Sequence, residues 1–125
     1  MKLLLDTQLM LWWLADSPKL SRQARAFIAD PENTVFVSAA TMWEIRIKEK
    51  LGKLDVPANL IDTVRSEEFE WIPISAEHAD ATRDLPLLHR DPFDRMLVAQ
   101  AKWMGITLLT SDPMLAQYGN FVKRV

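Results

Sequence analysis

The sequence predicts an α/β fold of three layers, in which a central and mostly parallel sheet of four or five strands lies between two layers of helices. Two observations lead to this prediction. Short apolar runs alternate with longer amphipathic stretches, and no internal repeat, low-complexity tract or linker interrupts the 125 residues. Strands that alternate with helices imply right-handed βαβ crossovers and a parallel sheet that is covered on both faces. We therefore expect a single domain over residues 1–125.

The expected strands are short apolar runs, with the lengths that are typical of buried parallel strands. They are Leu3–Leu5, Val35–Val37, Trp71–Ile74, Ile106–Leu109 and Phe121–Val122. The chain opens like a signal peptide, but Asp6 ends the apolar run early and no small-residue cleavage site follows. The first run is therefore expected to be a strand of the mature fold. Pro73 suits the edge or the end of its strand, because proline cannot donate a ladder hydrogen bond.

The expected helices carry apolar residues at helical spacing, together with start and stop signals. They are Gln8–Leu14, Ser21–Ala29, Ala39–Leu51, Pro57–Arg65, Ser75–Arg83 and Pro92–Met104, with one more short turn after Leu109. The clearest is Pro92–Met104, because Asp91 precedes it, proline occupies its first position and Gly105 lies just beyond its end. Ser75 is the expected N-cap of its helix, and Gly52 is a candidate C-terminal cap.

The composition excludes several classes of protein. No apolar stretch approaches the roughly 18 residues of a membrane span. The chain has no cysteine, which excludes disulfides and thiolate metal sites and favours a reducing cytoplasm. With two histidines, a histidine zinc site is not expected, so oxygen ligands and Mg²⁺ or Mn²⁺ are favoured for any metal. The net charge of −2 argues against a broad basic face for nucleic acid but leaves room for a local basic rim.

Four acids fall where a parallel α/β sheet places its ligands. Asp6 directly follows the first strand, and Asp112 follows the strand Ile106–Leu109 by a short turn. Glu44 lies early in the helix that leaves the second strand, and Asp94 lies in the first turn of the Pro92 helix. Ligands bind at the carboxyl ends of such strands, and all four side chains can reach that edge.

Each acid also has an ordinary structural explanation. Asp6 and Asp112 fit helix N-caps, and Asp94 fits a first-turn acid that complements the helix dipole. Glu44 is spaced to pair with Lys48 one turn later. Helix geometry weakens two of these explanations. Glu44 shares a face with apolar residues, and so does Asp94, and a carboxylate on a buried stripe needs a partner.

If the four acids cluster, a functional explanation becomes stronger than the separate structural ones. Two carboxylates about 4 Å apart repel by roughly 4 kcal/mol at an effective dielectric constant near 20. Several such pairs would rival the whole stability of a domain, about 5–15 kcal/mol. A cluster is tolerable only when it is protonated or bound to a cation, and an all-oxygen shell suits Mg²⁺ or Mn²⁺.

Four segments that contain these acids resemble the motifs of the PIN-domain family, and specifically its VapC-type toxins from type II toxin–antitoxin pairs. The segments are Leu3-Leu4-Leu5-Asp6-Thr7, Ser38-Ala39-Ala40-Thr41-Met42-Trp43-Glu44-Ile45, His89-Arg90-Asp91-Pro92-Phe93-Asp94-Arg95-Met96-Leu97-Val98-Ala99-Gln100-Ala101 and Leu109-Thr110-Ser111-Asp112. They occur in the family's order and span most of the chain. The resemblance implies a PIN-like α/β/α fold and a metal-dependent endoribonuclease that hydrolyses RNA phosphodiester bonds. It also implies a VapB-like antitoxin and a homodimer as partners.

The resemblance also implies roles for individual residues. The catalytic and metal-binding acids would be Asp6, Glu44, Asp94 and Asp112, with Mg²⁺ or Mn²⁺ as the cofactor. Thr7, Thr110 and Ser111 are candidates for hydrogen bonds that orient these ligands. Asp91 is better explained as the N-cap of the Pro92 helix, with a secondary role near the metal. Similar sequences often carry histidine where this chain has Gln8.

Basic side chains near the acids are candidates for holding RNA phosphates. Arg46, Lys48, Lys50 and Lys53 lie near Glu44, while Arg90 and Arg95 flank Asp94. Arg95 is the strongest single candidate, because it is adjacent to an acid of the site. The competing explanation is an ordinary solvated helix face. The five tryptophans are expected in the core or at an interface. His89 is a candidate for a role near the site, but a structural bond within its loop is favoured.

Three rival functions use the same fold class. A receiver-like switch needs adjacent acids after the first strand and an aspartate after a central strand, but Thr7 follows Asp6 and Ser38 follows Val37. A phosphatase with a nucleophilic aspartate needs a second aspartate where Gln8 stands. The third rival is a PIN fold retained only for binding, and the presence of all four acids gives no sign of such decay.

Overall fold

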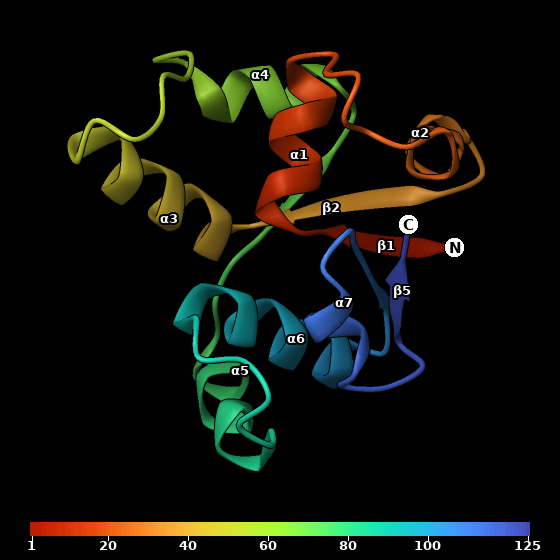
Figure 1. Cartoon of the computed structure of the whole chain (residues 1–125), viewed down its shortest axis with the longest axis vertical. Coiled ribbons are helices and arrows are strands. Elements are labelled where there is room, and N and C mark those ends of the chain that lie inside the picture. The colour runs from red at the N-terminus through yellow and green to blue at the C-terminus, as the bar shows by residue number, and fades with distance from the viewer.

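The computed structural model describes residues 1–125, and its centre is one five-stranded sheet (Figure 1). The strands are β1 (Lys2–Leu5), β2 (Thr34–Ser38), β3 (Glu70–Ile72), β4 (Thr107–Thr110) and β5 (Val122–Arg124). Their spatial order is β3-β2-β1-β4-β5, and every neighbouring pair is parallel. The prediction of four or five mostly parallel strands is confirmed, with five strands and no antiparallel pair.

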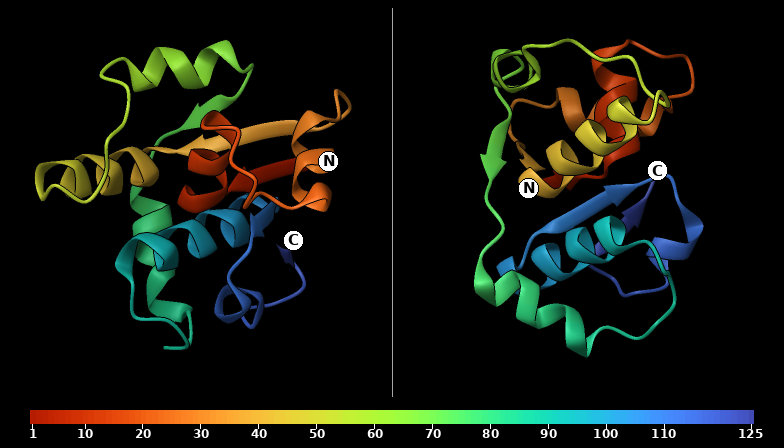
Figure 2. Two further views of the ribbon diagram at one scale, coloured as in Figure 1. Left: turned by 45° about the horizontal axis from the view of Figure 1, so that its top comes forward. Right: turned by 90° about the vertical axis from the view of Figure 1, so that its left-hand side faces the viewer.

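Helices cover both faces of this sheet (Figure 2). They are α1 (Thr7–Leu14), α2 (Arg22–Ala29), α3 (Ala39–Lys50), α4 (Leu60–Ser66), α5 (Ala76–Ala81), a 3₁₀ turn at Thr82–Asp84, α6 (Pro92–Met104) and α7 (Pro113–Ala116). Side chains of β1 alternate between the two faces. Leu3 and Leu5 pack in a core cluster with residues of α1, α2 and α4, whereas Leu4 packs with residues of α6 and α7. This alternation produces the three predicted layers.

Most predicted elements form within one or two residues of their expected bounds, and the differences have local causes. The helix expected from Pro57 begins at Leu60, because its first backbone hydrogen bond runs from Thr63 N–H to the Asn59 carbonyl, at 3.0 Å. β3 ends at Ile72, directly before Pro73, which has no N–H to donate. The helix expected over Ser75–Arg83 is α5 followed by the tighter 3₁₀ turn.

Helix α3 leaves the carboxyl end of β2 and reaches beyond the sheet edge, so its two sides face different layers. Ala40 packs in the cluster with α6, while Ile45 packs in the cluster with α1 and α4. A buried polar network fixes α6 against this end of the sheet. Gln100 of α6 accepts from the Ser38 hydroxyl at 2.6 Å and donates to the Pro73 carbonyl at 3.1 Å. Both helices therefore have defined positions at the carboxyl edge.

The sheet has a topological switch point between β1 and β4. The chain leaves β1 into α1 in one helical layer, and it leaves β4 into α7 in the other layer. Divergent connections of this kind open a crevice at the carboxyl ends of the two strands. The two strands remain joined at its floor, where the Asp6 N–H donates to the Leu109 carbonyl at 3.1 Å.

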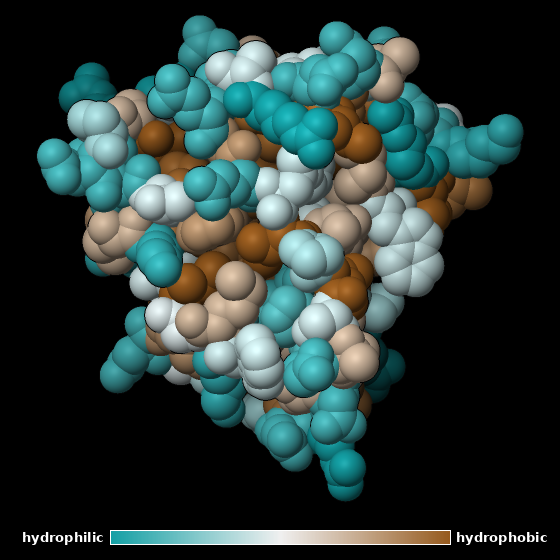
Figure 3. Space-filling view, turned by 180° about the vertical axis from the view of Figure 1, so that it is seen from behind, coloured by the Kyte–Doolittle hydropathy of each residue, from teal (hydrophilic) through white to brown (hydrophobic).

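Several large apolar side chains remain at the surface. The exposed ones are Met1, Trp43, Ile47, Leu51, Ile61, Leu87, Trp103 and Met114. On the face seen from behind, apolar surface lies among polar side chains (Figure 3). Trp12, Trp13 and Trp71 pack against the core, as expected, whereas Trp43 is exposed and meets the Phe93 ring edge-on. None of the helices combines the length and the apolar character that crossing a membrane requires.

Substitution of Gly105 tests how α6 ends. This residue adopts φ +69 as the C-cap of α6, and an added Cβ would meet no atom within 4 Å. Gly105→Ala should therefore destabilise the fold by about 1 kcal/mol through backbone strain alone. Urea unfolding measures the difference, and Gly105→Asn, which tolerates the left-handed conformation better, should lose less. Equal stability of the alanine variant would contradict this account.

Candidate active site

The crevice at the switch point contains all four predicted acids. Asp6, Glu44, Asp94 and Asp112 come from four different elements and line one cavity of about 290 Å³. Thr7, Gln8, Ser111 and Lys48 line it as well, together with three leucines. The structure thus brings together side chains that lie up to 106 positions apart in the sequence, from residue 6 to residue 112.

Asp6 is both a helix cap and a wall of the cavity. Its Oδ1 accepts from the Leu9 N–H at 2.7 Å, which caps α1, and its Oδ2 accepts from the Thr110 hydroxyl at 2.5 Å. The side chain is buried. Thr110 also accepts the Asp112 N–H at 3.0 Å. One hydroxyl at the end of β4 therefore fixes Asp6 and the backbone of Asp112 together.

Glu44 lies buried on the inner face of α3 with two partners. Its Oε1 accepts from the Thr7 hydroxyl at 2.8 Å, and its Oε2 contacts Lys48 Nζ at 2.5 Å. Thr7 has a single hydroxyl proton, which goes to Glu44, so Thr41 must donate across the 3.0 Å contact between the two threonines. The chain Thr41–Thr7–Glu44 orients this carboxylate.

Asp94 and Asp112 complete the acidic wall. Asp112 caps α7 by accepting from the Met114 N–H at 2.8 Å. Asp91 caps α6 by accepting from the Phe93 and Asp94 N–H groups, which is its predicted structural role. Asp94 has no capping bond of its own. Its carboxylate is therefore free to face the other acids across the cavity.

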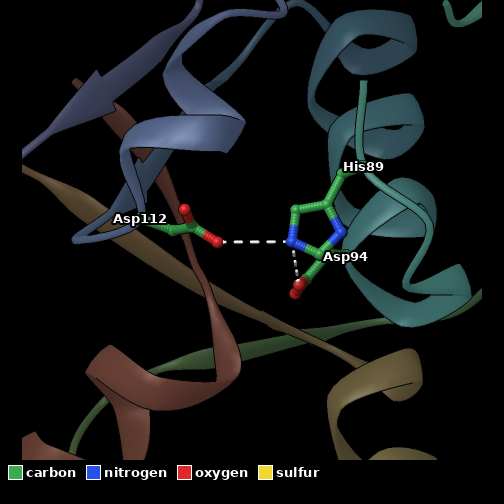
Figure 4. A group of neighbouring side chains, drawn as sticks. All are labelled: His89, Asp94 and Asp112. Carbon is green, nitrogen blue, oxygen red and sulfur yellow. Dashed lines mark ion pairs between the residues drawn. The ribbon is translucent and has the colours of Figure 1, made fainter. Parts of the chain in front are cut away.

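His89 is a residue of this site for which the sequence favoured a structural bond over a role near the acids. It makes the expected bond within its loop, since Nδ1 accepts from the Asp91 N–H at 3.1 Å. Its Nε2 also lies 3.4 Å from Asp94 Oδ2 and 3.3 Å from Asp112 Oδ2 (Figure 4). The sequence shows no periodicity in this loop, so only the path of residues 85–91 could reveal the second contact.

The electrostatics follow from this crowding. Burial, and then the negative charges of Asp91 and Glu44, raise the pKa of Asp94 to about 7. Burial is also the main cause that raises the pKa of Asp6 to about 6, against the hydrogen bonds from Thr110 and Leu9 that lower it. The hydrogen bond to Glu44 raises the pKa of Lys48, so its ammonium group stays charged at neutral pH.

The predicted basic rim is only partly present at the cavity. Lys48 lines it, but Arg46 pairs with Glu49 at 2.8 Å and donates to the Ala58 carbonyl. Lys50, Lys53 and Arg90 are exposed and do not line the cavity.

Arg95 was the strongest candidate for an RNA contact, yet it does not line the acidic cavity. Its guanidinium donates to the carbonyls of Thr82, Leu85 and Pro86 and to the Tyr118 hydroxyl. With these bonds, Arg95 stabilises the loop that precedes α6. An RNA contact by Arg95 stays a prediction that the structure does not favour.

The donor set fits a hard divalent cation. Four carboxylates supply only oxygen ligands, and the hydrogen bonds described above fix Asp6, Glu44 and Asp112 in place. Oxygen-only sets of this kind suit Mg²⁺ or Mn²⁺ better than the softer transition metals. Burial, together with the neighbouring acids, raises the pKa values of Asp6 and Asp94, and a bound cation would favour the ionised form of both carboxylates.

Fold and site together define a parallel α/β protein with four clustered carboxylates at its topological switch point. The PIN domain family model matches residues 3–120, and the chain belongs to the PIN domain family. Ribonuclease VapC16 of Mycobacterium tuberculosis is 37% identical over 68 residues, which are 50% of this chain and 48% of that relative. The match thus spans about half the length of the relative.

Two solved structures share the fold over nearly the whole chain. VapBC2 from Rickettsia felis, bound to a DNA fragment from its promoter, has a TM-score of 0.68 at 14% identity, covering 99% of this chain and 98% of its own. A toxin–antitoxin complex from Klebsiella pneumoniae has a TM-score of 0.64 at 21% identity, covering 98% of each chain. The predicted family and fold are confirmed, and the receiver-like and phosphatase alternatives are wrong.

The raised pKa values predict how stability depends on pH without metal. The folded protein holds protons on Asp6 and Asp94 that the unfolded chain releases near the ordinary value of 3.8. Their contribution to stability is therefore complete at low pH and is lost as the pH rises through about 6 and 7. Urea unfolding in EDTA at several pH values measures this loss. Asp94→Asn should flatten it above pH 6, and an unchanged slope would contradict the assignment.

Proposed function

We propose that this protein is a metal-dependent endoribonuclease and the toxin of a VapBC-type toxin–antitoxin pair, acting on cytoplasmic RNA. The observation that carries the proposal is the convergence of Asp6, Glu44, Asp94 and Asp112 on one cavity. A fold that needed only stability would not bury carboxylates whose pKa values their surroundings raise. Membership of the PIN family and likeness to a VapC ribonuclease support the reaction class.

The chain's own residues would hold the reacting groups in place. The four carboxylates would bind Mg²⁺ or Mn²⁺, which lowers the pKa of the attacking water and offsets charge on the phosphate. Thr7 and Thr110 keep Glu44 and Asp6 in fixed orientations, so little reorganisation would be needed during the reaction. Lys48 is the one cationic side chain that lines the cavity, and it would contact a phosphate oxygen. In-line attack would leave a 5′-phosphate and a 3′-hydroxyl.

The proposed partners are RNA, a VapB-like antitoxin and a second copy of the chain. The similar solved structures include toxin–antitoxin complexes. Trp43 and Ile47 of α3, Leu51 at its C-cap and Ile61 of α4 are exposed apolar side chains that a protein partner would cover. Co-expression with the neighbouring open reading frame, followed by size-exclusion chromatography with light scattering, would test both protein partners.

Asp94→Asn tests the reaction class directly. This change removes a carboxylate charge without changing the size of the side chain, so cleavage of a labelled RNA pool in Mg²⁺ or Mn²⁺ should fall by at least about 100-fold. Asp62→Asn is the matched control, because Asp62 is exposed on α4 and pairs only with Arg65. Cleavage by wild type should stop in EDTA. Undiminished cleavage by the Asp94 variant would overturn the proposed site.

Lys48→Gln tests the phosphate contact. RNA binding is measured over a range of salt concentrations with Asp94→Asn protein, so that the RNA stays intact. Loss of one phosphate contact should weaken binding and reduce the salt slope by about one. Lys48→Arg should keep the slope, and Lys102→Gln should not change it, because Lys102 lines a different hollow beside Trp103. A slope unchanged by Lys48→Gln would remove this lysine from the interface.

A further inference from the structure

The His89 ring lies between two acids that come from separate elements. Asp94 belongs to α6 and Asp112 precedes α7, and the ring stands between their carboxylates (Figure 4). Nε2 is 3.4 Å from Asp94 Oδ2 and 3.3 Å from Asp112 Oδ2. The histidine is the only group that contacts both side chains, so it is placed to set the distance between them.

The other ring nitrogen fixes where the histidine proton resides. Nδ1 accepts the Asp91 N–H at 3.1 Å, so it carries no proton. A neutral imidazole with an acceptor at Nδ1 has its hydrogen on Nε2. Both carboxylates therefore face one N–H group, which is shared between them.

The tautomer of His89 also separates it from the metal ligands. His89, Asp94 and Asp112 offer atoms within 4.8 Å of one another, a spacing that a cation could bridge. A histidine that binds metal through Nε2 normally donates its Nδ1–H to a neighbour. Here Nδ1 accepts instead, so Nε2 keeps its hydrogen and its lone pair is not free to bind a cation.

The loop that carries the ring is itself fixed. The Tyr118 hydroxyl accepts from the His89 N–H at 3.1 Å and from the Arg95 guanidinium at 3.2 Å. Arg95 also binds the carbonyls of Thr82 and Pro86 in the same loop. These bonds fix the backbone of the loop, and the bond from the Asp91 N–H to Nδ1 fixes the ring, as a group that positions other side chains requires.

We infer that His89 is a positioning residue, whose Nε2–H holds the Asp94 and Asp112 carboxylates at the separation that the divalent cation requires. This inference rests on the proposed function, because it assumes a cation among the four acids. Asp94 Oδ1 has no hydrogen-bond partner and stays available as a ligand, while Asp112 Oδ1 accepts from the Met114 N–H. Loss of an outer contact that orients metal ligands lowers metal affinity by about 10-fold to 100-fold.

Two conservative variants separate the two nitrogens. The amide of glutamine reaches the place of Nε2, so His89→Gln keeps a donor between the acids. The shorter side chain of asparagine reaches the place of Nδ1, so His89→Asn keeps the turn to Asp91 but loses the bridge. Mn²⁺ affinity of the full chain is measured from the signal of free Mn²⁺ in electron paramagnetic resonance. We expect His89→Asn to bind about 10-fold more weakly, and His89→Gln to bind within about threefold of wild type.

Three results would overturn the inference. Wild-type affinity in His89→Asn would show that the bridge has no effect on the metal. Weak binding by the glutamine variant with normal binding by the asparagine variant would place the role in the loop turn. Nitrogen coupling to Mn²⁺ in electron spin echo spectra of wild type would make His89 a direct ligand, since the other histidine, His78, is buried in another network.

The same titration separates this inference from the proposed function. Wild type that binds Mn²⁺, and Asp94→Asn that does not, would support the metal site whatever the histidine variants do. Absence of Mn²⁺ binding by wild type would overturn the metal site and the role of His89 together.

Discussion

Repulsion among carboxylates that share one small cavity is the constraint on which the arrangement of this protein depends. Each of the four acids meets a group that limits its negative charge or fixes its direction. Lys48 contacts Glu44, His89 contacts Asp94 and Asp112, and the Thr110 hydroxyl donates to Asp6. These contacts hold the cluster together, but burial and the neighbouring negative charges still raise the pKa values of Asp6 and Asp94. A divalent cation bound among the four acids would offset this repulsion, and their oxygen-only donor set fits such an ion.

The sheet makes the crowding possible, because it brings distant segments to one edge. β1 and β4 pair in parallel with Leu5 opposite Leu109, so Asp6 directly after β1 and Asp112 two residues after β4 lie at the same edge of the sheet. The other two acids lie on helices that the polar network of Gln100 and Ser38 fixes to the same edge. The buried hydrogen bond between Ser38 and Gln100 thus affects the geometry of the site, because it fixes α6 next to the start of α3.

Sequence patterns predicted the sheet, most helices and the convergence of the acids, because each depends on local signals. Leu3–Leu5 is apolar throughout, as a strand covered on both faces must be, and Asp91-Pro92 marks the start of α6. The partners of Arg95 and His89 were not predictable in the same way. Both depend on the path of the loop between the 3₁₀ turn and α6, which has no periodic pattern and is held by Tyr118 from a distant segment. The role of Thr41 was missed because its hydroxyl acts through Thr7.

Two of the four acids also have a structural role as helix caps, and this affects how relatives of this chain could diverge. Asp6 and Asp112 each begin a helix, so a descendant that no longer used the site would still be selected to keep a capping side chain there. Asp94 makes no cap, and Glu44 is held only by Thr7 and Lys48. Drift after loss of activity would therefore appear first at positions 44 and 94. Among sequences of this kind, positions 44 and 94 would therefore show most clearly whether the proposed metal site is retained.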